Sequence, residues 1–156
     1  MQQFILGACA FFVAFMLEHL PLPELLFWLQ PQWALLMVTL LVLHAPRAYG
    51  LWLAVPAGLM MDTETGNVLG LHVITFTVHI FLVQLFIRRL DGFNLIQQML
   101  MVLILVLAHQ LVLFWVSQML LPFPIPVSIW SPALTSALVW PWAYAITQLT
   151  IRRLLS

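Results

Sequence analysis

Long apolar stretches separated by short polar segments run through the whole chain. They cover approximately residues 4–20, 27–43, 49–61, 68–87, 95–121 and 132–151. A helix needs about 20 mostly apolar residues to cross a hydrocarbon core of about 30 Å. The third stretch is short, so it must be tilted, extended through residues 63–65, or re-entrant; we favour a short span. The pattern predicts an all-α integral membrane protein of about six transmembrane helices in one domain over residues 1–156.

The composition agrees with this prediction. Of the 156 residues, 64% are hydrophobic and 6% are charged, whereas soluble domains carry about 25% charged residues. The net charge is zero, and the sequence has no basic patch typical of nucleic-acid binding. The single cysteine, Cys9, cannot form an intrachain disulfide. A soluble fold and a nucleic-acid partner are therefore not expected.

Charged residues are distributed unequally over the predicted loops. With the N-terminus inside and six crossings, every arginine lies on the cytoplasmic side, in agreement with the positive-inside rule. We therefore expect both termini in the cytoplasm, and the arginines to be topology anchors. A docking site for a cytoplasmic partner is the alternative interpretation. The arginines are Arg47, Arg88, Arg89, Arg152 and Arg153.

Tryptophans mark the expected ends of the spans. Indole rings gather at the level of the lipid headgroups, because one edge of the ring is polar and the rest is apolar. We therefore expect an interfacial aromatic belt formed by Trp28, Trp33, Trp52, Trp130 and Trp140.

Small residues recur at every fourth position in the third stretch. This spacing places them on one face of a helix, where they let the backbones of membrane helices approach closely. A second pair with the same spacing stands before the fourth stretch. We therefore expect a tight hairpin of the third and fourth helices. The candidates for helix packing or partner contact are Gly50, Ala54, Gly58, Asp62, Gly66 and Gly70.

Asp62 is the ionisable residue at the end of the third stretch. Ionisable side chains near membrane spans are usually functional or paired. The alternative is a structural cap for the next helix, begun around Thr65 and Gly66, from a watery interface. The sequence leaves both interpretations open.

Three histidines lie in the fourth and fifth apolar stretches: His72 and His79 on one face of the fourth predicted helix, and His109 in the fifth. Histidines can bind metals or relay protons, but hydrogen-bonded histidines between helices are more common. We expect no metal, no cofactor and no catalytic residue. No serine stands in a nucleophile-elbow context, and Asp62 has no second aspartate for an intramembrane dyad.

Four segments form an ordered set of motifs. They are Gln30-Pro31-Gln32-Trp33-Ala34-Leu35-Leu36; Ala45-Pro46-Arg47 with Gly50; Gly58-Leu59-Met60-Met61-Asp62 with Gly66 and Leu69-Gly70; and Trp140-Pro141-Trp142. Together they resemble the rod-shape-determining protein MreD family in its proteobacterial form, over nearly the whole chain. Ala54, where many relatives have glycine, and the histidines His72 and His79 depart from the family pattern.

The resemblance implies a non-enzymatic subunit of the cell-elongation machinery (the elongasome) in the bacterial inner membrane, with a role in rod shape and peptidoglycan synthesis. The implied partners are MreC, RodA, a penicillin-binding transpeptidase, the MreB filament and lipid. The family is also similar in fold to the substrate-binding components of vitamin transporters, so a small-molecule-binding transporter component is the alternative.

A transporter component needs several polar groups that converge on a solute. Few are available at the predicted outer face. This small number of polar residues favours a surface for protein contacts over a solute-binding site. The residues are Glu18, His19, Asp62, Glu64 and Asn67.

Overall fold

The computed structural model describes residues 2–21, 23, 29–66, 68–90, 92–120 and 130–155. In this part of the chain all regular structure is helical, so the all-α prediction is confirmed. The helices are α1 (Gln2–Glu18), α3 (Trp33–His44), the short 3₁₀-helix η1 (Leu51–Leu53), α4 (Ala54–Thr65), α5 (Leu71–Leu90), α6 (Leu95–Leu120) and α7 (Ser131–Leu155).

One described helix, α6, is long and apolar enough to cross a membrane by length and composition. The apolar parts of α1, α3 and α5 are shorter. In the third stretch, η1 and α4 together run from residue 51 to residue 65, so the helix extends through the polar segment 63–65. The number of crossings remains a prediction.

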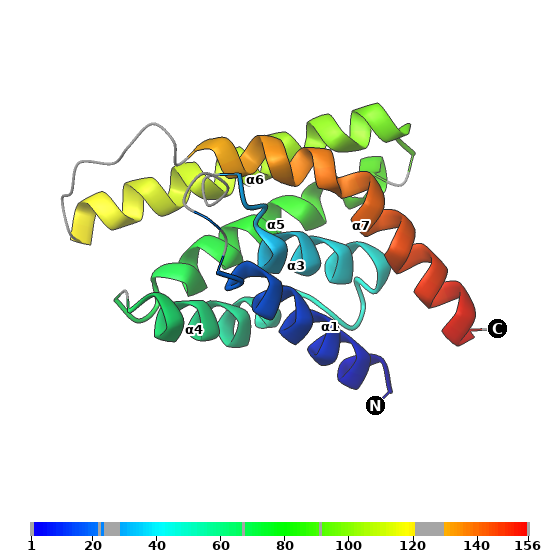
Figure 1. Ribbon diagram of the computed structural model, residues 1–156, viewed down its shortest axis with the longest axis horizontal. Helices are drawn as coiled ribbons and strands as arrows, with labels where there is room; N and C mark the ends of the chain where they lie inside the picture. The colour runs from blue at the N-terminus through cyan, green and yellow to red at the C-terminus, as the bar shows by residue number, and fades with distance from the viewer. Residues whose placement is uncertain are drawn as a thin grey trace.

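The helices α3 and α5 lie at the centre of the bundle (Figure 1). α3 packs against α1, α5 and α7, and α5 packs against α3, α4 and α6. Because α6 also packs against α7, the helices α3, α5, α6 and α7 close a ring. α1 is attached to this ring through α3, and α4 through α5.

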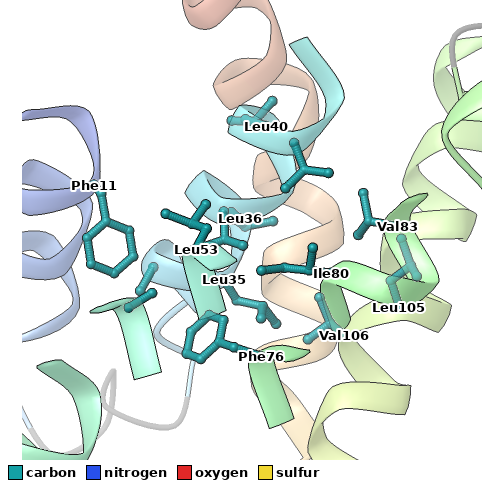
Figure 2. Close-up of a cluster of buried hydrophobic side chains, with 14 of the residues drawn as sticks. Phe11, Leu35, Leu36, Leu40, Leu53, Phe76, Ile80, Val83, Leu105 and Val106 are labelled. Carbon is teal, nitrogen blue, oxygen red and sulfur yellow. The ribbon is translucent and has the colours of Figure 1, made fainter. Parts of the chain in front are cut away.

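Apolar side chains fill the centre of the ring (Figure 2). Ile80 and Val83 of α5 are completely buried, and Leu105 of α6 is 2% exposed. Eight of the twelve residues of α3 are buried. A helix with this many neighbours must be apolar on all sides, which explains why α3 shows no polar face.

Trp140 lies inside the bundle, so the aromatic-belt prediction is wrong for this residue. Its side chain is completely buried, and its Nε1 donates a hydrogen bond to Gln98 Oε1 at 3.3 Å. Trp142 is 74% exposed. Between them stands Pro141, which removes a backbone donor from the helix, and Figure 1 shows that α7 bends part-way along its length. Trp28 lies outside the described residues.

Candidate functional site

Asp62 lies in the last turn of α4, and its carboxylate caps the start of α5. Its Oδ2 accepts the backbone N–H of Gly70 at 2.7 Å, and its Oδ1 accepts the backbone N–H of His72 at 2.9 Å. The first N–H groups of a helix have no partner within the helix, and they favour a nearby negative charge. The residue is 1% exposed. Asp62 is therefore a buried cap that the preceding helix supplies.

The ring of His72 donates a third hydrogen bond to the Asp62 carboxylate. Its Nδ1 lies 2.8 Å from Oδ1, and both side chains are nearly inaccessible to solvent, at 8% for His72 and 0% for Asp62. Three N–H donors around one carboxylate favour its ionised form. The geometry thus combines the two alternatives that the sequence leaves open for Asp62, a helix cap and a pair with a buried histidine.

Gly58, one turn before Asp62, lies where the backbones of α4 and α5 touch. A Cβ atom at Gly58 would stand 2.5 Å from both N and Cα of Val73, and 2.8 Å from the carbonyl carbon of His72. These are atoms of a helix backbone, which cannot rotate out of the way. Ala54, one turn earlier again, is completely buried. Small residues at these positions allow the close approach of the two helices.

The other three glycines of the candidate set lie outside the helices. Gly50 precedes η1 in an extended conformation, so it is not part of the helix face. Gly66 and Gly70 have φ angles of 64° and 101°, and a Cβ at either would meet nothing within 4 Å. Gly66 and Gly70 therefore do not lie in the contact between α4 and α5, and contact with a partner at these positions remains a prediction. Both are required instead by the left-handed backbone of the turn between α4 and α5.

Glu18 forms a second cap of the same kind at the end of α1. Its Oε2 accepts the backbone N–H of Ala34, in the first turn of α3, at 2.7 Å. Gln30 fixes the same helix end, because its Nε2 donates to the backbone oxygen of Glu18 at 2.6 Å. His19 and Glu64 connect the ends of α1 and α4, with 3.8 Å between Nε2 and Oε1. Sequence reasoning missed the Glu18 cap.

The outer polar residues considered for a solute site are thus mostly engaged within the chain. Glu18 and Asp62 cap helices, and the ring of His19 also contacts the backbone oxygen of Phe15 at 2.8 Å. In the described part of the chain, no group of three or more His, Cys, Asp or Glu side chains could hold a metal ion. Asn67 lies outside the described residues.

His79 and His109 are buried between the central helices. The hydroxyl of Thr39 lies 2.8 Å from the backbone oxygen of Leu35, and it forms a hydrogen bond with Nε2 of His79 at 2.9 Å. The two histidine rings meet edge to face, with centroids 5.6 Å apart. Side-chain hydrogen bonds between membrane helices contribute about 0.6 kcal/mol on average. The His79–Thr39 bond links α5 to α3.

The structure describes the side chains of two of the five arginines that are proposed as topology anchors. Arg47 and Arg89 are exposed. The side chains of Arg88, Arg152 and Arg153 lie outside the described residues. The arginine-based topology therefore remains a prediction.

A comparison with known protein families gives one decisive match. The model of the family described as "rod shape-determining protein MreD" matches residues 1–150. The chain belongs to the MreD family. The rod shape-determining protein MreD of Haemophilus influenzae is 28% identical over 148 residues, which cover 92% of this chain and 88% of that relative. The family resemblance expected from the motifs is thus confirmed.

No solved structure matches the chain, so the fold likeness to vitamin-transporter components remains a prediction. Membership of the MreD family makes the chain a membrane protein of the cell-shape machinery. Two of the four motif segments form the caps: residues 30–36 meet Glu18, and residues 58–70 carry Asp62. In this MreD protein two of the segments that carry the family resemblance therefore help to join its helices in pairs.

Proposed function

We propose that this MreD protein is a non-enzymatic subunit of the cell-elongation machinery in the bacterial inner membrane, and that it acts by binding MreC. Through MreC it associates with RodA, a penicillin-binding transpeptidase and the MreB filament during peptidoglycan synthesis. Family membership supports the role in rod shape. The polar side chains at the helix ends serve as caps that stabilise the bundle and do not form a reactive centre. This use of the polar residues supports a binding role.

The observation that carries partner binding is a stripe of large apolar side chains on the outer face of α6. They recur at intervals of four or seven residues, so they share one helix face. Figure 1 shows the C-terminal end of α6, in yellow, projecting beyond the start of α7. A membrane helix of a partner can pack along such a face. The stripe consists of Leu100, Ile104, Leu111, Trp115 and Met119, which are 48–80% exposed.

We also propose six crossings with both termini in the cytoplasm. The placement of all arginines on one side supports this topology. The first residues of α1 and the last residues of α7 lie at the same end of the bundle (Figure 1), which supports an even number of crossings. In intact cells, a thiol reagent in the periplasm should label Glu24→Cys and Pro126→Cys but not Arg88→Cys. Labelling at position 88 would contradict the topology.

Rescue and co-purification together test the function. Cells depleted of the protein should change from rods to spheres, and a tagged copy in mild detergent should retain an MreC-like protein. The double variant Trp115→Ala, Met119→Ala should be expressed normally but retain less of that partner. Trp142→Ala on the exposed face of α7 is the matched control. Normal rod growth after clean deletion would refute the proposal, and loss of vitamin uptake with normal shape would favour the transporter alternative.

A further inference from the structure

An apolar cavity lies between α1 and α4. α1 packs against α3 and α4 packs against α5, and the space that separates α1 from α4 holds a cavity of ≈ 460 Å³. Phe11 and Phe12 line it from α1, Pro56 and Met60 line it from α4, and Trp52 of η1 lies beside them. The volume falls within the range of about 300–1,000 Å³ that is usual for ligand sites. Such a lining suits a hydrocarbon chain and offers water few partners.

A second cavity, of ≈ 630 Å³, adjoins the first at the turn between α3 and η1. Phe4 lines both cavities, and residues 44–48, Arg47 among them, form the rest of the second one. Both ring nitrogens of His44 are engaged within the bundle, with Nδ1 2.9 Å from Leu40 O and Nε2 3.1 Å from Gln148 Nε2. The permanently charged residue of this lining is Arg47.

Arg47 has no anionic partner among the carboxylates that the structure describes. Glu18 and Asp62 are engaged as helix caps, and Glu64 lies beside His19. A guanidinium presents a planar fork of donors that matches a phosphate. A cation without a partner among the described carboxylates, beside a hydrocarbon-sized cavity, thus has the charge and shape to receive an anionic headgroup with an attached chain.

We propose that the two cavities form one binding site for an anionic phospholipid, with the phosphate at Arg47 and an acyl chain between α1 and α4. A role as topology anchor accounts for the charge of Arg47 but not for the apolar cavity next to it. On the proposed topology Arg47 faces the cytoplasmic leaflet, which is where anionic lipids attract basic side chains. The site is independent of MreC binding, so each proposal can fail without the other.

Native mass spectrometry of the purified full-length protein in mild detergent tests this site. Dioleoyl phosphatidylglycerol and dioleoyl phosphatidylcholine have the same chains and differ in headgroup charge, so they are titrated in parallel. The protein should retain phosphatidylglycerol in preference to phosphatidylcholine. Arg47→Gln should weaken the binding of phosphatidylglycerol about fivefold, the effect of one basic side chain at a lipid surface. Arg89→Gln removes the same charge from another exposed position and should change nothing.

A second pair of variants tests the chain-binding part. Ala8→Phe adds bulk at an exposed residue that lines the apolar cavity, so it should displace the lipid. Cys9→Phe adds similar bulk at the next residue, which is exposed but does not line the cavity, and it should bind as the wild type does. The proposal would be overturned if the protein retained the two lipids equally, or if Arg47→Gln and Arg89→Gln weakened phosphatidylglycerol binding equally. It would also be overturned if Ala8→Phe bound lipid as the wild type does, or if the protein formed a dimer that retained no lipid.

Discussion

Alanine at Gly58 is the smallest change that tests how much the contact between α4 and α5 contributes to stability. The added Cβ would lie 2.5 Å from N and Cα of Val73. Carbon atoms in ordinary contact are about 3.5–4.0 Å apart, so α4 must move about 1 Å away from α5. The helix as a whole has to move, because the atoms in the way belong to the α5 backbone.

This movement lowers the free energy of unfolding in two ways. Forcing an extra methyl group into a packed contact costs about 1–3 kcal/mol. The shift also stretches the bonds that Asp62, one turn further along α4, makes to Gly70 and His72 at 2.7–2.9 Å. The higher helix propensity of alanine offsets about 1 kcal/mol. We expect a net loss of about 1–3 kcal/mol in Gly58→Ala.

The measurement is a titration of the purified protein from mild into denaturing detergent, followed by circular dichroism. Gly92→Ala is the matched control, because its Cβ would meet the backbone oxygen of Arg89 at an ordinary 3.7 Å. The control should stay within about 0.5 kcal/mol of the wild type. A Gly58→Ala protein as stable as the wild type would refute the reasoning that the two backbones are in contact.

Two further substitutions test the buried polar groups by the same titration and by rescue of cell shape in a deletion strain. Asp62→Asn should lower the free energy of unfolding by about 1–3 kcal/mol and rescue cell shape only in part, because its amide group faces the N–H of Gly70 or His72 as a second donor. Glu64→Gln, on the exposed side of α4, is the control. Full rescue by Asp62→Asn would show that the charge of Asp62 has no role. Thr39→Val should lower the free energy of unfolding by about 1–3 kcal/mol, because it leaves the buried Nε2 of His79 without its hydrogen-bond partner. Thr77→Val, whose hydroxyl donates to Val73 O within its own helix, should cost less, and equal losses would contradict a link between α3 and α5.

The sequence predicts the helices well because each apolar stretch is long enough to form one, whatever its neighbours are. The third stretch was the difficult case, since it ends in polar residues. Its helix continues because Thr63 and Thr65 donate their hydroxyls to backbone oxygens one turn earlier, at 2.9 and 2.8 Å. Polar side chains satisfied within the helix do not interrupt it.

Spacing alone was misleading where the local backbone was not a helix. Gly66 and Gly70 have the four-residue spacing of a packing motif, but they lie in a turn, where their positive φ angles decide the residue type. The residue type of Trp140 predicts a place at an interface, yet the side chain is buried and its Nε1 donates to Gln98. Which face of a helix meets a neighbour depends on tertiary packing, and one sequence does not contain that information directly.

The two acidic caps show why the site was harder to predict than the helices. Rules for caps examine the residue that directly precedes a helix, but Gln32 makes no side-chain cap bond to α3. Glu18 reaches the second residue of α3, and Asp62 reaches the second residue of α5, each from the end of another helix. Hydrogen bonds to a carboxyl group are strong where water is excluded. Each cap therefore holds the end of one helix against the start of the next. The joined pairs α1–α3 and α4–α5 stabilise the bundle that carries the exposed apolar faces.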